Sequence, residues 1–350
     1  MKDELTRPPS PKSEDPGAAL RKKDHIKMAF LSQVSQGDLD GRFFYEPLLS
    51  GHPDKGSWPV FSFLGKTMRV PVWVSSMTGG TGLAHRINHN LARACGEFGM
   101  GMGLGSCRQL LYSDEFLNDF AVRPLIGPDY PLFANLGIAQ VEQLVQGRTL
   151  DLIDKLIQKL EADGLIVHIN PFQEWLQPEG DRYHRPPLET IAALLDHAAY
   201  PIIVKEVGQG MGMESLRALL QMPVAAIDFA AAGGTNFSKL ELLRSSPQKS
   251  EIFGHLAHIG HTFTDMVEMV NSLCAELGDT VRCRQIIVSG GVKHFLDGYY
   301  AIQKLGLPAV YGQASALLQY AREDYDILQA YVSAQIEGLE LARAFLRIRN

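Results

Sequence analysis

The sequence is poor in cysteine and lacks any long apolar segment. Only 4 of its 350 residues are cysteines, and they are scattered without the spacing of a metal site. A disulfide framework is not expected in so large a chain, so the cytoplasm, a reducing compartment, is the expected location. No run of about 18 apolar residues occurs, which argues against a membrane span. The first residues are polar and proline-rich, unlike a secretory signal.

An excess of positive charge is missing as well. The chain has 33 Lys and Arg against 39 Asp and Glu, a net charge of -6. This balance argues against a general nucleic-acid surface, although a local basic cluster could hold a small anion. Residues 1–19 combine four prolines with few apolar groups, so we expect a disordered tail. We expect residues 20–350 to form a single domain, although 350 residues with 45% hydrophobic content would suit one large barrel or two ordinary domains.

Eight short apolar runs alternate with helical patterns after this tail. Strands that are buried on both faces are nearly continuous in their hydrophobicity, as these runs are. The runs cover residues 70–75, 100–104, 131–135, 164–169, 201–207, 225–229, 285–289 and 309–312. Between two of them, Ile153, Leu156 and Leu160 follow a helical spacing that stops at Asp163-Gly164.

Eight such units in about 250 residues predict an α/β fold, the eight-fold β/α (TIM) barrel. A doubly wound open sheet is the alternative. No GxGxxG fingerprint supports that alternative, because the glycines at 99, 101, 103 and 105 recur every second residue, which is the period of a strand.

The carboxyl ends of all eight predicted strands are polar or rich in glycine. Active sites of barrels assemble at these ends, so together they predict a site, although turn formation would explain any single segment. Gly290, Gly291 and Gly312 follow the last two predicted strands, where barrels often hold a phosphate on backbone amides. Thr235 adds a hydroxyl after another strand. These residues predict a phosphate-bearing cofactor.

Asn135 and Lys205 end two of the central strands, and we expect their side chains in the barrel mouth. A buried lysine needs a reason, and a hydrogen bond to the electron-rich edge of a flavin ring would be one. The alternative is a lysine that pairs with a neighbouring carboxylate for structure alone.

His168 and Asn170 stand two residues apart on a predicted strand and should share a face. The following loop brings Gln173 and Glu174 to the same mouth. A carboxylate beside neutral hydrogen-bonding groups and a phosphate ligand is what a Mg²⁺ site requires. A lone histidine is more often a core residue than a catalyst, and the dense pattern His-x-Asn-x-x-Gln-Glu favours function here.

Two cationic segments could meet an anionic substrate. Arg108 offers a planar fork for phosphate, and Ser106 lies beside it. Arg21-Lys22-Lys23-Asp24-His25 closes the tail, although a charge run is usually a solvated face.

These motifs resemble the FMN-dependent, type 2 isopentenyl diphosphate isomerase family. The match runs from Arg21 to about Leu318, and the combination of RKxxH with HxNxxQE separates this family from other FMN barrels. The matching segments are RKKDH at 21–25, MTGG at 77–80, GSCR at 105–108, HINPFQE at 168–174, QPEGD at 177–181, VKEVGQG at 204–210, GGTNF at 233–237 and SGG at 289–291.

The resemblance implies the interconversion of isopentenyl and dimethylallyl diphosphate in isoprenoid biosynthesis, with reduced FMN, Mg²⁺ and NADPH as the reductant. It implies a homo-oligomer, a tetramer or octamer, with neither nucleic-acid nor membrane partners. The implied FMN contacts are Met77, Thr78, Gly79, Ser106, Asn135, Lys205, Thr235, Gly290, Gly291, Gly312 and Ala314. The implied substrate contacts are Arg21, Lys22, His25, Ser106, Arg108, Asn170 and Gln173. Gln173 and His168 would be catalytic, and Glu174 would hold the metal.

The sequence departs from the family pattern around the expected phosphate end of FMN. Ala231 stands where the family commonly has glycine, residues 258–262 replace a WGIPT segment, and residues 293–295 replace Arg-Asn-Gly. Two other functions remain open: an FMN-dependent hydroxy-acid oxidase or dehydrogenase on the same barrel, and a non-catalytic flavin-binding protein.

Overall fold

The eight predicted strands close into one parallel barrel. In the computed structural model, which describes residues 18–76 and 82–349, each strand pairs with the next along the chain and the last pairs with the first. The strands are β4 (Val72–Val74), β5 (Gly101–Gly103), β6 (Leu132–Gly137), β7 (Gly164–His168), β8 (Ile202–Lys205), β9 (Ala226–Asp228), β10 (Ile286–Ser289) and β11 (Ala309–Gln313). The predicted fold class is confirmed, and the open sheet is excluded.

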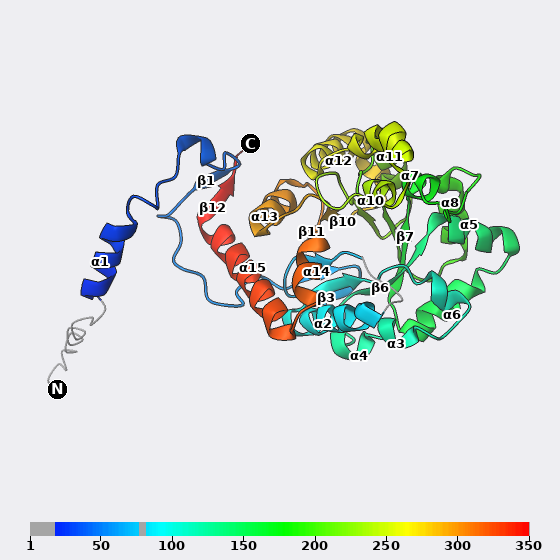
Figure 1. Cartoon of the computed structure of the whole chain (residues 1–350), viewed down its shortest axis with the longest axis horizontal. Helices are drawn as coiled ribbons and strands as arrows, with labels where there is room; N and C mark the ends of the chain where they lie inside the picture. The colour runs from blue at the N-terminus through cyan, green and yellow to red at the C-terminus, as the bar shows by residue number, and fades with distance from the viewer. Residues whose placement is uncertain (1–17, 77–81, 350) are drawn as a thin grey trace. The chain divides into compact units, whose positions relative to one another are not determined.

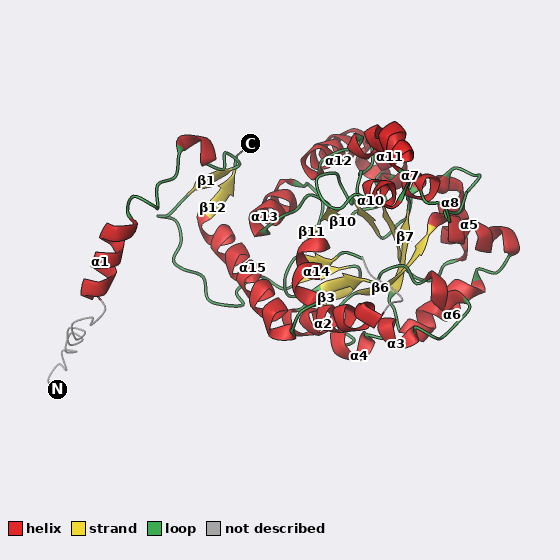
Figure 2. Ribbon diagram, in the orientation of Figure 1, coloured by secondary structure: helices red, strands yellow, loops and turns green. Residues whose placement is uncertain are grey.

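Helices surround the barrel strands on the outside, as Figures 1 and 2 show. They are α2 (Gly82–Phe98), α3 (Leu117–Phe120), α4 (Arg123–Ile126), α5 (Ile138–Gly147), α6 (Asp151–Leu160), α7 (Pro171–Leu176), α8 (Pro187–His197), α9 (Met213–Leu220), α10 (Phe237–Arg244), α11 (Pro247–Phe253), α12 (Phe263–Leu277), α13 (Phe295–Lys304), α14 (Ser315–Ala321) and α15 (Tyr325–Phe345), with the 3-10 turns η2 (Arg108–Leu111), η3 (Gly254–His258) and η4 (Gly278–Thr280). Among the described residues, no helix combines the length and the apolar character that crossing a bilayer would need.

One strand and one helix end earlier than predicted, for reasons of local structure. The strand predicted to reach residue 207 ends at Lys205, because Glu206 Oε2 accepts hydrogen bonds from the amides of Gly208 (2.7 Å) and Gln209 (2.6 Å) and turns the chain. The helix predicted to stop at Asp163-Gly164 ends at Leu160, since Glu161 takes a left-handed conformation with φ 49°.

One end of the barrel is closed by a hairpin. Strands β2 (Phe61–Phe63) and β3 (Lys66–Met68) pair antiparallel ahead of the first barrel strand. Phe63, Leu64 and Met68 are buried in the same cluster as the interior residues of the barrel. Because the hairpin fills this end, we expect ligands to enter from the carboxyl ends of the strands.

By its internal contacts the chain divides into a unit ending at Phe44, with Arg349, and a barrel unit from Tyr45 to Ile348. The first unit contains α1 (Ala18–Met28) and the turn η1 (Gln36–Asp38); the short strands β1 (Phe43–Tyr45) and β12 (Leu346–Ile348) complete the elements. The predicted tail of residues 1–19 lies outside the described residues except for its last two, which belong to α1. The disorder of the tail and a single domain over residues 20–350 stay predictions.

Candidate functional site

A layer of polar side chains lies at the open end of the barrel interior. Below it, Trp73, Phe133, Ile166, Ile203, Ala226, Ile287 and Val310 belong to one buried apolar cluster. Side chains alternate along a strand, so the residue two positions further on in each strand also points inward. These residues include Ser75, Asn135, His168, Lys205, Asp228 and Ser289, which we call the polar floor. The floor separates the dry core from the mouth of the barrel.

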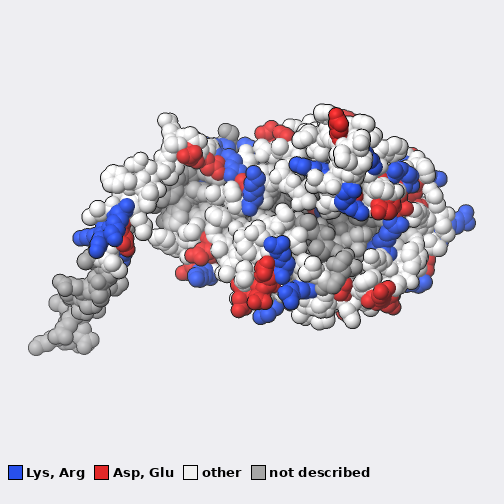
Figure 3. Space-filling model, viewed as in Figure 1, with Lys and Arg blue, Asp and Glu red and all other residues white. Residues whose placement is uncertain are grey.

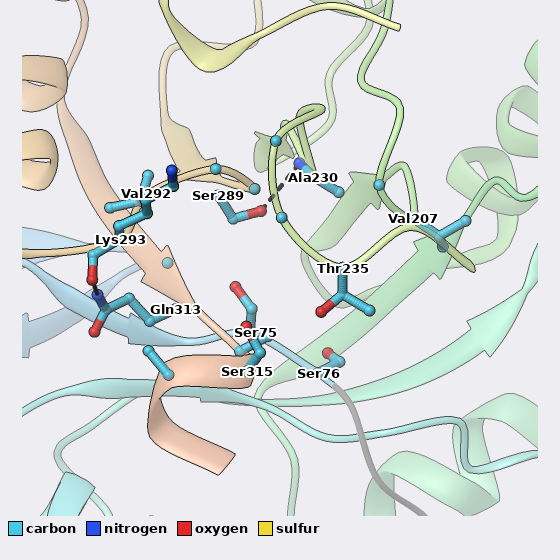
Figure 4. A pocket seen from close by; sticks show the side chains of 18 of the residues that line it. Ser75, Ser76, Val207, Ala230, Thr235, Ser289, Val292, Lys293, Gln313 and Ser315 are labelled. Carbon is cyan, nitrogen blue, oxygen red and sulfur yellow. Dashed lines mark hydrogen bonds between the residues drawn. The ribbon is translucent and has the colours of Figure 1, made fainter. Parts of the chain in front are cut away.

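A cavity of about 390 Å³ opens above one side of the polar floor. The hydroxyl groups of Ser75, Ser76 and Thr235 face this space, and Ser289 borders it from the end of β10 (Figure 4). The volume lies in the range of small-molecule and cofactor pockets. Six of the residues predicted to bind the cofactor line it together: Lys205, Thr235, Gly290, Gly291, Gly312 and Ala314.

The wall of the cavity requires glycine at two of these positions. Gly290 has φ 81°, and a Cβ atom there would lie 2.1 Å from the Ala231 carbonyl oxygen. A Cβ atom on Gly312 would lie 2.4 Å from Ser75 Oγ. Gly290 therefore lets backbone approach backbone, and Gly312 makes room for the Ser75 side chain. Close approach of backbone is how glycine-rich turns hold phosphate groups.

Buried polar atoms without partners mark where a ligand is expected. Within the described parts of the chain, Ser75 Oγ, Ser76 Oγ and Asp228 Oδ2 are buried and have no hydrogen-bond partner. Such atoms are rare in folded proteins, because burial without a partner costs about 1–3 kcal/mol each. Two of the three line the cavity, so its residues suit a ligand rich in hydrogen-bonding groups, as FMN is.

Lys205 lies in the polar floor between two other titratable side chains. The strand register pairs it with His168 on one side and Asp228 on the other. Lys205 Nζ donates to the Glu206 carbonyl oxygen at 2.9 Å, and no ion pair among the described residues includes Lys205. Burial raises the pKa of the Asp228 carboxyl above its usual range, against the opposing effect of Lys205. The purely structural ion pair considered for Lys205 is therefore not present, and the lysine lines the cavity.

His168 is held as a neutral imidazole. Its Nδ1 lies 2.8 Å from Asn135 Oδ1, while the Asn135 amide nitrogen donates to the Leu104 carbonyl oxygen at 2.9 Å. This orientation of the amide places the proton on Nδ1 and leaves Nε2 as an acceptor. Burial, reinforced by the charge of Lys205, lowers the pKa of His168 to about 3. His168 therefore offers a lone pair near neutral pH, not a positive charge.

Asn170, Gln173 and Glu174 form a hydrogen-bonded group at the start of α7. Asn170 Nδ2 donates to Gln173 Oε1 (3.1 Å) and to Glu174 Oε1 (3.0 Å). The predicted common strand face of His168 and Asn170 is wrong, because β7 ends at His168 and Asn170 is the N-cap of α7. The helix, not the strand, brings Asn170 to the carboxylate.

Arg108 joins this group through Asp181. Its Nη1 lies 2.6 Å from Asp181 Oδ2, and the Asp181 amide donates to Glu174 Oε2 at 2.7 Å. The neighbouring Cys107 is buried, and its amide donates to the Asn135 carbonyl oxygen at 2.8 Å, so Ser106 and Arg108 are exposed on either side of it. Asn135 thus anchors both His168 and the arginine loop.

A hard cation would fit beside Glu174. Among the described residues no three His, Cys, Asp or Glu side chains gather into a metal site. Yet Asn170 Oδ1, next to this carboxylate, is buried and without a partner in the same part of the chain. A carboxylate and an amide oxygen are ligands that suit Mg²⁺ when substrate and water supply the rest.

The structure does not bring the remaining predicted residues into the cavity lining or into the hydrogen-bonded group around Glu174. Met77, Thr78 and Gly79 are outside the described residues. Arg21, Lys22 and His25 are exposed on α1, in the first unit of the chain. Ser106 and Asn135 do not line the cavity, although both lie at the carboxyl ends of strands.

Several residues of the site were not predicted from the sequence. No role was predicted for Ser75, Asp228 or Asp181, although Asp181 ends the QPEGD segment that matches the family. The period of two along each strand would have found the first two, since each follows a core residue by two positions. The QPEGD match marks Asp181, but its partner could be found only from the fold, because 41 residues separate it from Gln140.

The departures from the family pattern include helix caps and one residue of the cavity wall. Ala231 has no left-handed φ and is buried, and the left-handed residue is Ala230 with φ 42°. Thr262 forms a capping box with Asp265 at the start of α12, and the His294 side chain caps α13 by accepting from the Asp297 amide. The replaced segments thus contain helix caps, and one replaced residue, Lys293, lines the cavity.

Solved structures share this barrel fold. A mandelate oxidase variant with a monooxide FMN adduct aligns with a TM-score of 0.54 and 15% identity over 88% of both chains. A flavocytochrome b2 variant with bound sulfite aligns with a TM-score of 0.59 and 15% identity, over 87% of this chain and 72% of the other. Identities this low show the shared barrel fold alone.

Relatives in sequence define the family. No family model matches the chain. An isopentenyl-diphosphate delta-isomerase of Rickettsia felis is 34% identical over 326 residues, covering 92% of this chain and 90% of the relative. The isomerase of Rickettsia typhi is 34% identical over 322 residues, covering 91% and 89%. Since this similarity extends over nearly the whole of both chains and agrees with the motifs, the chain belongs to the isopentenyl-diphosphate delta-isomerase family.

Proposed function

We propose that the protein interconverts isopentenyl diphosphate and dimethylallyl diphosphate by a 1,3-proton shift, using FMN reduced by NADPH, and Mg²⁺. One observation carries the proposal: a flavin-sized cavity and the group around Glu174 open at the same end of the barrel, above the polar floor. A flavin site alone would suit an oxidase equally well, whereas a carboxylate poised for a cation beside Arg108 suits a diphosphate.

The residues that would hold FMN are those around the cavity. Gly290, Gly291 and Thr235 would receive its phosphate, and Lys205 would meet the ring. When bound and reduced, the flavin would supply the acid and base for the proton shift. The polar floor keeps water out from below, because the apolar cluster beneath it is fully packed.

The residues that would hold the diphosphate are cationic or bind a cation. Arg108 offers a planar donor set, and Arg21, Lys22 and His25 on α1 would add charge. Glu174 would hold Mg²⁺, which would offset the charge of the diphosphate. Because an unactivated alkene has no charged or hydrogen-bonding group for the protein to bind, binding of the diphosphate must position the reacting carbons.

Gln173 and His168 would face the reacting end of the substrate. The Gln173 side chain is oriented by its bond from Asn170, and His168 by its bond to Asn135. As a neutral group His168 can accept a proton or a hydrogen bond without repelling developing positive charge. Both residues would therefore shape a pocket that tolerates a carbocation-like transition state.

Omission of single components tests the proposal. We expect isomerisation of isopentenyl diphosphate only when reduced FMN and Mg²⁺ are both present, and no reduction of the oxidised flavin by the substrate. Substrate-driven flavin reduction with a 2-hydroxy acid would instead support the oxidase alternative. Failure of the reduced, FMN-loaded protein to isomerise would support a non-catalytic flavin-binding protein.

We further propose a cytoplasmic homo-oligomer, a tetramer or octamer, with neither nucleic-acid nor membrane partners. Leu243 on α10, Ile252 on α11 and Ile259 beyond η3 are 80%, 69% and 62% exposed, which favours a covering partner. On the face shown in Figure 3, acidic and basic side chains are interspersed, which does not favour nucleic acid. Light scattering during gel filtration would measure the oligomer.

A further inference from the structure

We propose that Asp181 is a positioning residue of the diphosphate site, which fixes the guanidinium of Arg108 relative to the carboxylate of Glu174. The inference rests on the proposed function, because that function brings diphosphate and cation to these two side chains.

Asp181 contacts both of the groups concerned. Its Oδ2 lies 2.6 Å from Arg108 Nη1 and accepts from Gln140 Nε2 at 2.9 Å. Its backbone amide donates to Glu174 Oε2 at 2.7 Å. One residue thus ties an arginine that follows β5 to a carboxylate on α7, although the two come from separate loops of the barrel.

Asp181 is itself held in place from two sides. Gln140 accepts through Oε1 from the Gly137 amide at 3.0 Å, which connects Asp181 to the end of β6. The loop before Asp181 packs tightly on α7, since a Cβ atom on Gly180 would lie 2.0 Å from the Glu174 carbonyl oxygen. The position of the Asp181 carboxylate is therefore set by the barrel rather than by Arg108.

Two effects of the carboxylate on an incoming diphosphate oppose each other. Its negative charge repels the anion, but the paired Arg108 guanidinium offsets part of this charge, and solvent screens part of the repulsion because the side chains of Arg108 and Asp181 are 51% and 19% exposed. The ion pair also restricts a long and flexible arginine side chain before substrate arrives, which reduces the entropy lost on binding. Because the screened repulsion is weak and a free arginine has many rotamers, we expect the positioning effect to dominate.

Three variants separate positioning from charge and from folding. Asp181→Ala removes the carboxylate but keeps the backbone amide that donates to Glu174. Asp181→Asn keeps one oxygen that can accept from both Arg108 and Gln140. Glu179→Ala is the matched control, because Glu179 is an exposed acid in the same loop and lies 3.6 Å from Arg244.

The measurement is calorimetric binding of inorganic pyrophosphate with Mg²⁺ to the FMN-loaded, oxidised protein. We expect about 10-fold weaker binding for Asp181→Ala, as befits a charge-assisted contact, and less than about 3-fold change for Asp181→Asn and Glu179→Ala. FMN affinity should stay unchanged in all three. If the alanine variant fails to fold, Asp181→Ser, whose side chain is too short to reach Arg108, takes its place.

A double-mutant cycle tests whether the effect passes through Arg108. In an Arg108→Ala background, Asp181→Ala should weaken pyrophosphate binding by less than about 2-fold more. Unchanged or tighter binding in the single variant, or a full additive loss in the double variant, would overturn the positioning role. Absence of isomerisation by the wild-type protein would instead refute the proposed function, so the two failures can be told apart.

Discussion

Replacing Glu174 by glutamine should weaken cation binding. It should also lower the free energy of unfolding, by an amount that follows from the hydrogen bonds of Glu174. The carboxylate is 8% exposed; Oε1 accepts from Asn170 and Oε2 from the Asp181 amide. An amide has only one acceptor oxygen, so in Glu174→Gln one of these donors must face an NH₂ group. The variant keeps the volume of the side chain and loses its charge.

The magnitudes follow from these contacts. Loss of one hydrogen bond to a charged acceptor should lower the free energy of unfolding by about 1.5–3 kcal/mol. Loss of the anionic ligand should lower kcat/KM by at least about 100-fold, equivalent to roughly 2.7 kcal/mol of transition-state stabilisation. FMN affinity should not change, because Glu174 does not line the flavin cavity.

Steady-state isomerase assays across a Mg²⁺ titration, together with denaturant unfolding, measure both effects. Glu179→Gln is the matched control and should behave as the wild type in both. Near-normal turnover of Glu174→Gln with an unchanged Mg²⁺ dependence would refute the assignment of the cation to this carboxylate.

Three further predictions concern the cavity, the histidine and the chain start. Gly290→Ala should weaken FMN binding by at least about 10-fold in fluorescence titrations, because its Cβ atom would meet the Ala231 backbone; unchanged affinity would remove Gly290 from the cavity wall. The pKa of His168 is about 3 when folded and about 6.5 when unfolded, so protonation of the unfolded chain lowers stability as pH falls below 6.5. His168→Gln should therefore lose about 2 kcal/mol less free energy of unfolding than the wild type between pH 7 and pH 5, and equal losses would contradict a neutral histidine. Deleting residues 1–18 should leave turnover nearly unchanged, whereas deleting residues 1–26 should lower kcat/KM by orders of magnitude without changing FMN binding. Full activity of the longer deletion would show that Arg21, Lys22 and His25 belong to a solvated face and do not bind the substrate.

The strands were predictable because a strand that is buried on both faces appears in the sequence as a short, continuous apolar run. All eight runs are apolar on both faces, and each observed strand overlaps its predicted range. The glycines at 101 and 103 followed the strand period because Trp73 occupies the space of the first side chain, 2.4 Å from its would-be Cβ atom. The carboxyl-end loops then placed Lys205, Thr235, Gly290 and Gly312 around one cavity.

The polar contacts were not predictable, because they join residues that are far apart in the sequence. Asn135 meets His168 across 33 residues, and Arg108 meets Asp181 from a different loop of the barrel. The neutral state of His168 depends on its burial and on the charge of Lys205 in the next strand. Neither can be inferred from the sequence around His168. The common strand face inferred for His168 and Asn170 was wrong because hydrophobicity does not show where a strand gives way to a helix cap.

The most direct measurement of the central claim is the conversion of isopentenyl diphosphate to dimethylallyl diphosphate in deuterium oxide. We predict turnover only with FMN, a reductant and Mg²⁺ present together, with deuterium incorporated into the product and no net consumption of reductant. Equal turnover by flavin-free protein, or reductant consumed in proportion to product, would contradict an isomerase that works through this cavity.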